Sequence, residues 1–298
     1  MSAALKGFVN AIVSAASFGL IPLFTLPVLA TGMHSSSILI YRYAFGCLAM
    51  LLILMVNRSR MSLGFGDFLR TLLLSVMYAV SSITLIEGYN YMAGGIATTL
   101  LFSYPVFTLL LSVIFFHERL SWITALAILL AVGGVFCLSG LLDGGGSIHS
   151  IKGLLLVLLS GFLYAVYMVV FPRVRVRKMP SLKITFYIFF FAMIILTLYG
   201  IFTNGRIEPI ETRSQLFNLV LLGLLPTALS NLTLIVSLKQ ISSTLVAVLG
   251  AFEPMTAMAI GIIVFHEPFT LPIIIGFLLI LFSVFLIVFF RKREIKDK

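Results

Sequence analysis

The sequence predicts an all-α integral membrane protein in which ten transmembrane helices form two inverted five-helix repeats around a central cavity. Three observations predict this fold: an apolar composition, a series of membrane-length hydrophobic runs, and a repeat at half the chain length. Hydrophobic residues make up 61% of the 298 residues and charged residues 10%, whereas soluble domains carry about a quarter charged residues. The net charge of +10 does not indicate a nucleic-acid partner, because the Lys and Arg residues lie in short loops and the C-terminal tail, as topology signals do.

Ten hydrophobic runs follow one another along the chain, separated by short loops. A helix needs about 20 apolar residues to cross a bilayer, and no stretch between the runs is long enough for a soluble domain. Cys47 and Cys137 both lie inside runs, which favours packing in the membrane core over a disulfide framework. The runs cover residues 7–29, 36–56, 68–88, 94–116, 121–141, 151–171, 182–203, 215–237, 242–265 and 271–290.

The chain repeats itself after 149 residues. Pro105 is matched by Pro254, and the His-Glu pair at 117–118 is matched by the pair at 266–267. Both prolines lie inside hydrophobic runs, where the missing backbone donor breaks a helix. Proline-interrupted segments at corresponding places in two halves are the best sequence pointer to a transporter's binding site. We therefore divide the chain into a first repeat, a Gly/Ser linker, and a second repeat with a short basic tail, over residues 1–143, 144–150 and 151–298.

The distribution of Lys and Arg indicates the orientation of the helices. With the N-terminus in the cytoplasm, 16 of the 20 Lys and Arg residues lie on the cytoplasmic side, three lie outside, and Arg42 lies within a helix. The positive-inside rule then places both termini in the cytoplasm. Because five helices per repeat is an odd number, the second repeat must enter from the opposite side. Inverted repeats favour alternating access, in which the halves exchange conformations and expose a central site to either side.

Glu253 is the residue whose position in the chain is most costly in free energy, because its carboxylate lies inside a membrane helix. Pro105 precedes Glu118 by 13 residues, which is about 20 Å of helix, so Tyr104-Pro105 and Glu253-Pro254 lie well inside the bilayer. A carboxylate there requires partners, water or a proton. We interpret Glu253 either as a partner of a substrate ammonium or a proton-coupling group, or as an interhelical hydrogen-bond anchor beside the proline break. Its counterpart in the first repeat is Tyr104, so the site is not symmetric in charge.

Polar and aromatic residues recur at helical spacing along several runs. Small hydroxyl residues in membrane helices most often serve close packing, but the stripes of the third and eighth runs are related by the repeat. We expect the first, third, fourth, sixth, eighth and ninth runs to line the central cavity. Such a wall suits small amphipathic solutes, including an ammonium group over a ring, and lacks the Lys and Arg cluster that a phosphate would need. The candidate substrate-binding residues are Asn10, Ser14, Phe18, Tyr78, Ser82, Tyr104, Tyr164, Tyr167, Asn231 and Glu253.

Glu87 lies near the outer end of the third run. It is either a gate or coupling carboxylate, or an interfacial residue that reaches water. Arg42, one turn into the second helix from the outside, is expected either to snorkel outward or to pair with Glu87. The candidate coupling or gating residues are Glu87, Glu253, Pro105 and Pro254.

No metal site, cofactor or enzymatic activity is predicted. The His-Glu pairs lack the second histidine of an H-E-x-x-H zinc motif, because Ser121 and Thr270 stand where it would be. No nucleophile–base pair and no metal-ligand cluster stand out elsewhere.

These residues resemble the drug/metabolite transporter superfamily, and its EamA-type members in particular. The resemblance covers the whole chain and implies ten helices in two EamA-like repeats, with helices 5 and 10 peripheral to a central cavity. It also implies export of amino acids, other metabolites or drugs, although some members move nucleotide sugars or phosphorylated compounds. Members usually have glycine before the repeated Glu, and the His residues here leave open a pH effect near either surface. The local marks are Tyr41-Arg42-Tyr43, Pro105 followed by Phe116-His117-Glu118-Arg119-Leu120, and Phe252-Glu253-Pro254 followed by Phe265-His266-Glu267-Pro268.

We therefore expect a secondary transporter that works by alternating access and exports small amphipathic metabolites such as amino acids or aromatic compounds. The alternatives are an uncoupled facilitator or exchanger, and a lipid-binding, lipid-flipping or scaffold membrane protein. The expected partners are a small-molecule substrate, the lipid bilayer and, as a coupling ion, protons; no nucleic acid is expected, and monomer and homodimer remain open. The expected location is a bacterial inner membrane, with both termini cytoplasmic.

Overall fold

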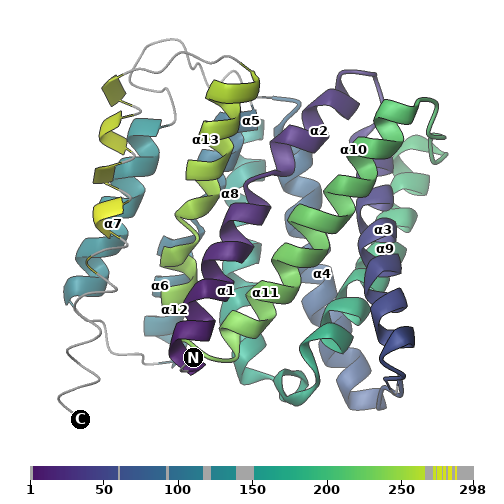
Figure 1. Ribbon diagram of the computed structural model, residues 1–298, viewed down its shortest axis with the longest axis horizontal. Coiled ribbons are helices and arrows are strands. Elements are labelled where there is room, and N and C mark those ends of the chain that lie inside the picture. The colour runs from purple at the N-terminus through teal and green to yellow at the C-terminus, as the bar shows by residue number, and fades with distance from the viewer. Residues whose placement is uncertain are drawn as a thin grey trace.

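The structure, a computed structural model, describes residues 3–59, 61–91, 94–116, 122–138 and 151–265, together with parts of 271–286. All regular structure in these residues is helical, and the helices stand side by side in one bundle (Figure 1). The predicted linker at 144–150 and both His-Glu pairs, at 117–118 and 266–267, lie outside the described residues.

Seven of the described helical segments are long and apolar enough to cross a membrane. Shorter apolar helices cover Tyr104–Phe115, Ala125–Gly134 and Ile274–Ser283, so all ten predicted runs are represented and the all-α membrane fold is confirmed. The seven long segments are Ala3–Leu29, Ser35–Val56, Phe65–Gly88, Ile151–Arg173, Ser181–Asn204, Arg213–Leu238 and Ser243–Phe265.

Five of the runs form uninterrupted helices in the described residues. Helix α3 packs along α9, and α4 packs along both α8 and α9. Helix α7 lies at the left edge of the bundle in Figure 1, where its Ala127 carbonyl accepts a hydrogen bond of 2.8 Å from Ser283 Oγ of the last run. These helices are α3 (Ser35–Val56), α4 (Phe65–Gly88), α7 (Trp122–Leu138), α8 (Ile151–Val170), which continues into the short turns η2 (Phe171–Arg173) and η3 (Arg175–Lys178), and α9 (Ser181–Asn204).

Two runs are broken at the positions that the repeated prolines predict. The fourth run divides into α5 (Gly94–Leu101) and α6 (Tyr104–Phe116), and the ninth into α12 (Ser243–Leu249) and α13 (Phe252–Val264). Pro105 and Pro254 stand in the first turn of α6 and α13, where a proline lacks no helical hydrogen bond. The breaks therefore lie at equivalent places in the two halves.

Two further interruptions were not predicted. The first run divides into α1 (Ala3–Phe18) and α2 (Ile21–Leu29). The eighth passes from α10 (Arg213–Gly223) through a π-helical turn, η4 (Leu224–Leu229), into α11 (Ser230–Leu238). Pro226 in that turn cannot donate to the Leu222 carbonyl one turn earlier. Thr227 Oγ1 donates to that carbonyl instead, at 2.7 Å, as hydroxyl side chains do beside prolines in membrane helices.

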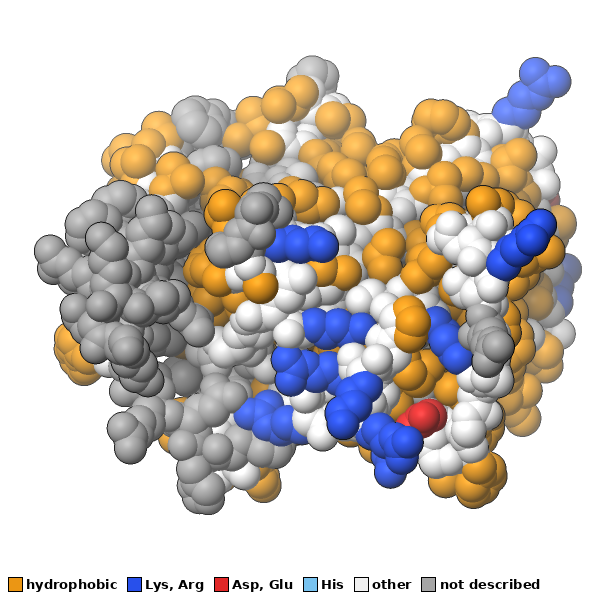
Figure 2. Space-filling model, turned by 60° about the horizontal axis from the view of Figure 1, so that its bottom comes forward, with side chains coloured by type: hydrophobic (Ala, Val, Ile, Leu, Met, Phe, Trp, Pro, Cys, Tyr) orange, Lys and Arg blue, Asp and Glu red, His pale blue; other side chains and the backbone are white. Residues whose placement is uncertain are grey.

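Cationic side chains gather at one end of the bundle, which we call the basic face. Figure 2 shows them as a group of blue side chains with little red among them. Asp67, an acidic residue on this face, lies 3.3 Å from Arg70. The described cationic residues at or beside this face are Lys6, Arg58, Arg70, Arg173, Arg175, Arg177, Lys178, Lys183 and Lys239.

The two halves enter the bundle from opposite ends. Gly7 in the first turns of α1 lies against Gln240, just beyond α11 on the basic face. By contrast, Lys152 in the first turn of α8 lies over the ring of Tyr91, just beyond the far end of α4, at 5.0 Å from the ring centroid. The first half therefore begins at the basic face and the second half at the opposite face, as an inverted repeat requires.

Candidate functional site

The two broken helices meet at the centre of the bundle through a pair of equivalent residues. Tyr104 begins α6 and Glu253 stands in the first turn of α13. The Tyr104 hydroxyl donates to Glu253 Oε1 at 3.1 Å, across 149 residues of sequence. Both side chains are buried, with 1% and 4% of their surface exposed. The breaks therefore bring a phenol and a carboxylate together inside the membrane.

Gly250 makes room for this contact. It lies at the break between α12 and α13, and a Cβ there would lie 1.6 Å from the Tyr104 hydroxyl oxygen. Its backbone φ of −57° is a conformation that any residue adopts. Space for the tyrosine, and not backbone conformation, therefore requires glycine at this position.

Aromatic rings surround the pair and fill the centre. The Tyr164 ring lies edge-on to Tyr104, with centroids 5.0 Å apart, and stacks on Phe18 at 5.8 Å. Tyr78 lies 5.3 Å from Tyr167 and 6.3 Å from Tyr164. These rings come from α1, α4, α6 and α8, which belong to four of the runs expected to line the central cavity. We call the whole assembly the central cluster, and it comprises Phe18, Arg42, Tyr43, Tyr78, Ser82, Tyr104, Tyr164, Tyr167, Thr227, Asn231 and Glu253.

Arg42 belongs to the central cluster, which corrects the expectation that it snorkels outward or pairs with Glu87. Its side chain is 1% exposed, and the described residues show no ion pair between it and a carboxylate. Its Nε donates to Thr227 Oγ1 at 2.6 Å. Its guanidinium lies 5.9 Å from the centroid of Phe18 and 5.5 Å from that of Tyr43. The threonine at the π turn and the two rings hold the cation inside the bundle.

Two predicted polar residues also lie in the cluster. Ser82 is bonded at 2.5 Å to the hydroxyl of Tyr43, a residue that the sequence offered only as part of a family mark. The Asn231 amide lies beside the hydroxyls of Tyr78 and Tyr167. Neither of its polar atoms has a partner of good hydrogen-bond geometry among the described residues. The cluster thus contains hydrogen-bonding groups that its own side chains do not pair.

Asn10 and Ser14 do not join the central cluster. Asn10 Nδ2 donates to the carbonyl of Lys6 in its own helix at 2.8 Å. Ser14 Oγ donates to the Ser230 carbonyl at 2.8 Å, and Ser230 Oγ donates back to the Ser14 carbonyl at 3.0 Å. Ser81, 149 residues before Ser230, forms the same reciprocal bonds with Ser160 at 3.0 and 2.7 Å. These serines clamp α1 to α11 and α4 to α8, so they serve packing.

Glu87 lies at the end of the bundle opposite the basic face. Its Oε2 accepts from Asn90 Nδ2 at 3.2 Å, and it lines a pocket of about 420 Å³. The pocket also includes His34, Tyr199 and Asn204. Glu87 thus lies apart from the central cluster.

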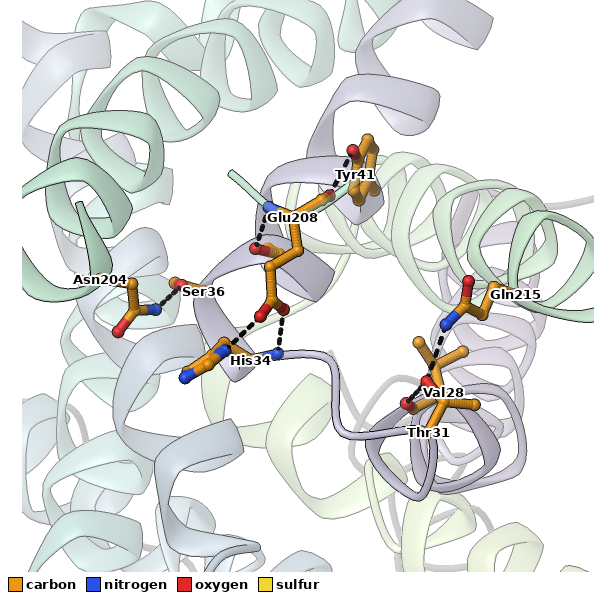
Figure 3. A network of polar contacts seen from close by, with 9 residues as sticks. Val28, Thr31, His34, Ser36, Tyr41, Asn204, Glu208 and Gln215 are labelled. Carbon is orange, nitrogen blue, oxygen red and sulfur yellow. Dashed lines mark hydrogen bonds and ion pairs between the residues drawn. The ribbon is translucent and has the colours of Figure 1, made fainter. Parts of the chain in front are cut away.

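Beside this pocket, polar contacts join the turn between α2 and α3 and the start of α3 to the end of α9, the following segment and the start of α10 (Figure 3). Glu208 accepts from the backbone N–H of His34 and contacts the ring Nδ1, each at 2.6 Å. Asn204 Nδ2 donates to Ser36 Oγ at 2.6 Å, and Gln215 Nε2 donates to Thr31 Oγ1 at 2.8 Å. These bonds tie the two halves together at the face opposite the basic face.

Comparisons with known proteins agree with this architecture. The EamA-like transporter family matches residues 5–140 and again 151–289. The chain is 20% identical to an uncharacterized transporter of Bacillus subtilis, YoaV, over 91% of this chain and 94% of that protein. It is 26% identical to an uncharacterized transporter of Archaeoglobus fulgidus, over 69% and 71% of the two chains. A solved crystal structure with 17% identity superposes with a TM-score of 0.80 over 98% of both chains, which shows a shared fold.

Proposed function

Because the chain belongs to the EamA-like transporter family, we propose that this membrane transporter is a secondary transporter that works by alternating access. We further propose that it exports small amphipathic metabolites such as amino acids or aromatic compounds. The direction and the general substrate class follow from the resemblance to EamA-type members. The chemistry of the central cluster supports the amphipathic character of the substrate.

The contact between Tyr104 and Glu253 carries the proposal. It joins the breaks of two helices, one from each half, and its two members are equivalent in the repeat. Broken helices at the interface of inverted repeats are where transporters bind substrates and coupling ions. A carboxylate held inside the membrane is costly and usually functional. We assign Glu253 the binding of a substrate ammonium group or of a coupling proton.

The rings around this contact define the rest of the proposed site. Phe18, Tyr78, Tyr164 and Tyr167 present aromatic faces and edges from three helices. Aromatic faces bind apolar bodies and ammonium groups alike. The rings pack against one another and are all buried, so a substrate enters only when the halves move apart. We propose that Pro105 and Pro254 act as the hinges of that movement.

The basic face supports a cytoplasmic location for that end of the bundle. The cationic residues there far outnumber the acidic ones in the described part of the chain, and the positive-inside rule assigns such an end to the cytoplasm. On this basis we propose that both termini are cytoplasmic, and we further propose a bacterial inner membrane as the location. Residues 1–143 and 151–298 are then the two moving halves.

Flux of labelled amino acids and aromatic metabolites in proteoliposomes tests the proposal, with Glu253→Gln compared against the wild type. We expect wild-type flux, and a changed rate and pH dependence in the variant with unchanged membrane insertion. Glu211→Gln, at an exposed glutamate before α10, is the matched control and should behave as the wild type.

Other outcomes would overturn particular parts of the proposal. Flux that ignores a collapsed pH gradient would indicate an uncoupled facilitator or exchanger. Movement of labelled lipids between leaflets without solute flux would indicate a flippase. The absence of both activities would indicate a scaffold. Glu253→Gln with wild-type flux at every pH would remove Glu253 from the mechanism.

A further inference from the structure

The central cluster contains a buried cation for which the proposed mechanism has no use. Arg42 lies in α3 within the membrane and is 1% exposed, and its charge has no carboxylate partner among the described residues. We propose that Arg42 is an anion-binding group of the transport site and that it takes a single carboxylate of the substrate. The inference rests on the proposed transport function and narrows its substrate class to monocarboxylates with an apolar or aromatic body.

The surroundings of the guanidinium leave one of its donors, Nη2, without a partner among the described residues. Its Nε is occupied by Thr227 at 2.6 Å. The rings of Phe18 and Tyr43 lie 5.9 and 5.5 Å from it. Its Nη2 is buried and has no hydrogen-bond partner in the described part of the chain. A guanidinium presents its donors in a planar fork that matches a carboxylate, so the unpaired Nη2 has the chemistry that an acid group needs.

Thr227 fixes the orientation of the Arg42 guanidinium, and with it the direction in which Nη2 points. The threonine donates to the Leu222 carbonyl at 2.7 Å, a carbonyl freed by the proline of the π turn. Its oxygen is thereby left to accept from Arg42. The arginine is thus held by a side chain of the second half while it belongs to the first. Arg42 accordingly lies at the interface of the two halves, where a transported group would bind.

Other buried polar atoms of the central cluster also lack partners of good hydrogen-bond geometry. Both polar atoms of Asn231 and the hydroxyl of Tyr167 are buried, and although the two side chains lie beside each other, none of these atoms has a hydrogen-bond partner of good geometry among the described residues. Asn231 lies one turn beyond Thr227, and Tyr78, which interacts electrostatically with Arg42, lies beside Asn231. A buried polar group left unpaired costs about 1–3 kcal/mol. A bound substrate would supply partners to a whole set of such atoms.

The charge of the site limits the anion to one negative charge. Glu253, the buried acidic residue of the cluster, is bonded to Tyr104 and forms no described ion pair with Arg42, so the charge of the guanidinium is left for a ligand. One guanidinium balances one carboxylate but not a phosphate dianion, for which proteins use several cationic groups. The aromatic walls suit an apolar body. These features together specify a monocarboxylate.

Paired ligands that differ only at the acid group test the inference. We would measure inhibition of flux by phenylalanine against phenylalaninamide, and by 3-phenylpropanoate against 3-phenylpropanamide. Because hydrogen bonds to charged groups contribute about 1.5–3 kcal/mol, the wild type should prefer each acid by about tenfold or more. Arg42→Gln should remove the preference, and Arg42→Lys should restore only part of it, because an ammonium lacks the planar fork.

Two further variants keep the test decisive if Arg42→Gln does not fold. Thr227→Ala leaves the cation but removes the group that orients it, so it should weaken both acids several-fold while leaving the amides unchanged. Arg213→Gln, at an exposed arginine that begins α10, is the matched control and should retain the full preference. Purified variants are compared by thermal unfolding before flux is measured.

The possible results separate this inference from the proposed function. Solute flux with equal inhibition by acids and amides, or by neither, would overturn the role of Arg42 while leaving the transporter in place. A preference for acids that persists in Arg42→Gln would do the same. Flux that requires chloride, with chloride displacing the acids, would assign the site to an inorganic anion instead. No flux of any solute would overturn the proposed function itself.

Discussion

The sharpest structural prediction concerns Gly250, which separates α12 from α13. In Gly250→Ala the new Cβ would lie 1.6 Å from Tyr104 Oη and 2.8 Å from its Cζ. Atoms in ordinary contact are about 3.5 Å apart, so the hydroxyl must move by about 2 Å. Its bond to Glu253 is 3.1 Å long and will not survive that shift. The substitution therefore separates the two helix breaks without touching the carboxylate itself.

The expected cost combines two effects. Overpacking of a well-packed core costs about 1–3 kcal/mol, and a buried polar group left without its partner costs about 1–3 kcal/mol more. Thermal unfolding in detergent should therefore show a melting temperature lowered by several degrees. Flux should fall together with stability, because Glu253 loses the group that positions it.

Two controls make the Gly250 prediction refutable. Gly133→Ala, in α7, places a Cβ where no described atom outside its own stretch of helix lies within 4 Å, and it should leave the melting temperature nearly unchanged. In a Tyr104→Ala background the clash is absent, so Gly250→Ala should cost little there, as a double-mutant cycle would reveal. If Gly250→Ala melts and transports like the wild type, the close packing of the two breaks is not what stabilises the site.

Three more predictions address the hinges and the two faces. Pro105→Ala and Pro254→Ala should slow flux without lowering the melting temperature, and wild-type flux in both would contradict the hinge role. Burial alone would raise the pKa of Glu208, but hydrogen bonds from His34 bring this pKa below 4.5. The contribution of Glu208 to the free energy of unfolding is therefore present above pH 4.5 and is lost as the pH falls further. Glu208→Gln should flatten that part of the curve of unfolding free energy against pH. Burial, together with the charge of Arg177, lowers the pKa of Lys239 from 10.5 to about 8. The contribution of Lys239 to the free energy of unfolding should therefore rise between pH 8 and 10.5. Reductive methylation of Lys239 should reach half its maximal rate near pH 8 and not near 10.5.

Much of the architecture could be predicted because it depends on local, additive signals. Hydrophobic length is enough to locate a membrane helix, and a proline marks its own break. Pro105 and Pro254 therefore locate the breaks of the fourth and ninth runs from the sequence alone. The same offset identified Tyr104 and Glu253 as counterparts, although only the structure shows that they touch.

The position of Arg42 could not be predicted for a different reason. Distance along a helix gives depth in the membrane, but the direction in which a side chain points depends on the neighbouring helices. The neighbours here are Phe18 from α1 and Thr227 from the π turn, and neither was linked to Arg42 by sequence spacing. The signal that existed was Pro226, which frees a carbonyl that Thr227 then satisfies. A proline followed by threonine in a membrane run indicates such an irregular turn.

Asn10 and Ser14 show the limit of reading helical stripes. Both lie on a polar stripe of α1, yet Asn10 bonds within its own helix and Ser14 bonds to Ser230. A stripe indicates that one face of a helix is buried against protein, but it does not distinguish a packing surface from a binding site. Phe18 on the same stripe does reach the cluster, because it lies beside the break at which α1 ends.

The contact between Tyr104 and Glu253 also shows where the two-fold axis that relates the two halves passes. In two inverted halves related by a two-fold axis, equivalent residues touch only where they lie at the axis. Ser81 and Ser230 are equivalent too, but they bond to different partners, Ser160 and Ser14, and so lie away from it. A movement that exchanges the conformations of the halves displaces the ends of the helices most and the axis least. On the proposed mechanism Glu253 would therefore hold its ligand at the point that moves least, and because its counterpart is a phenol, the proposed proton or ammonium would belong to the second half in both states.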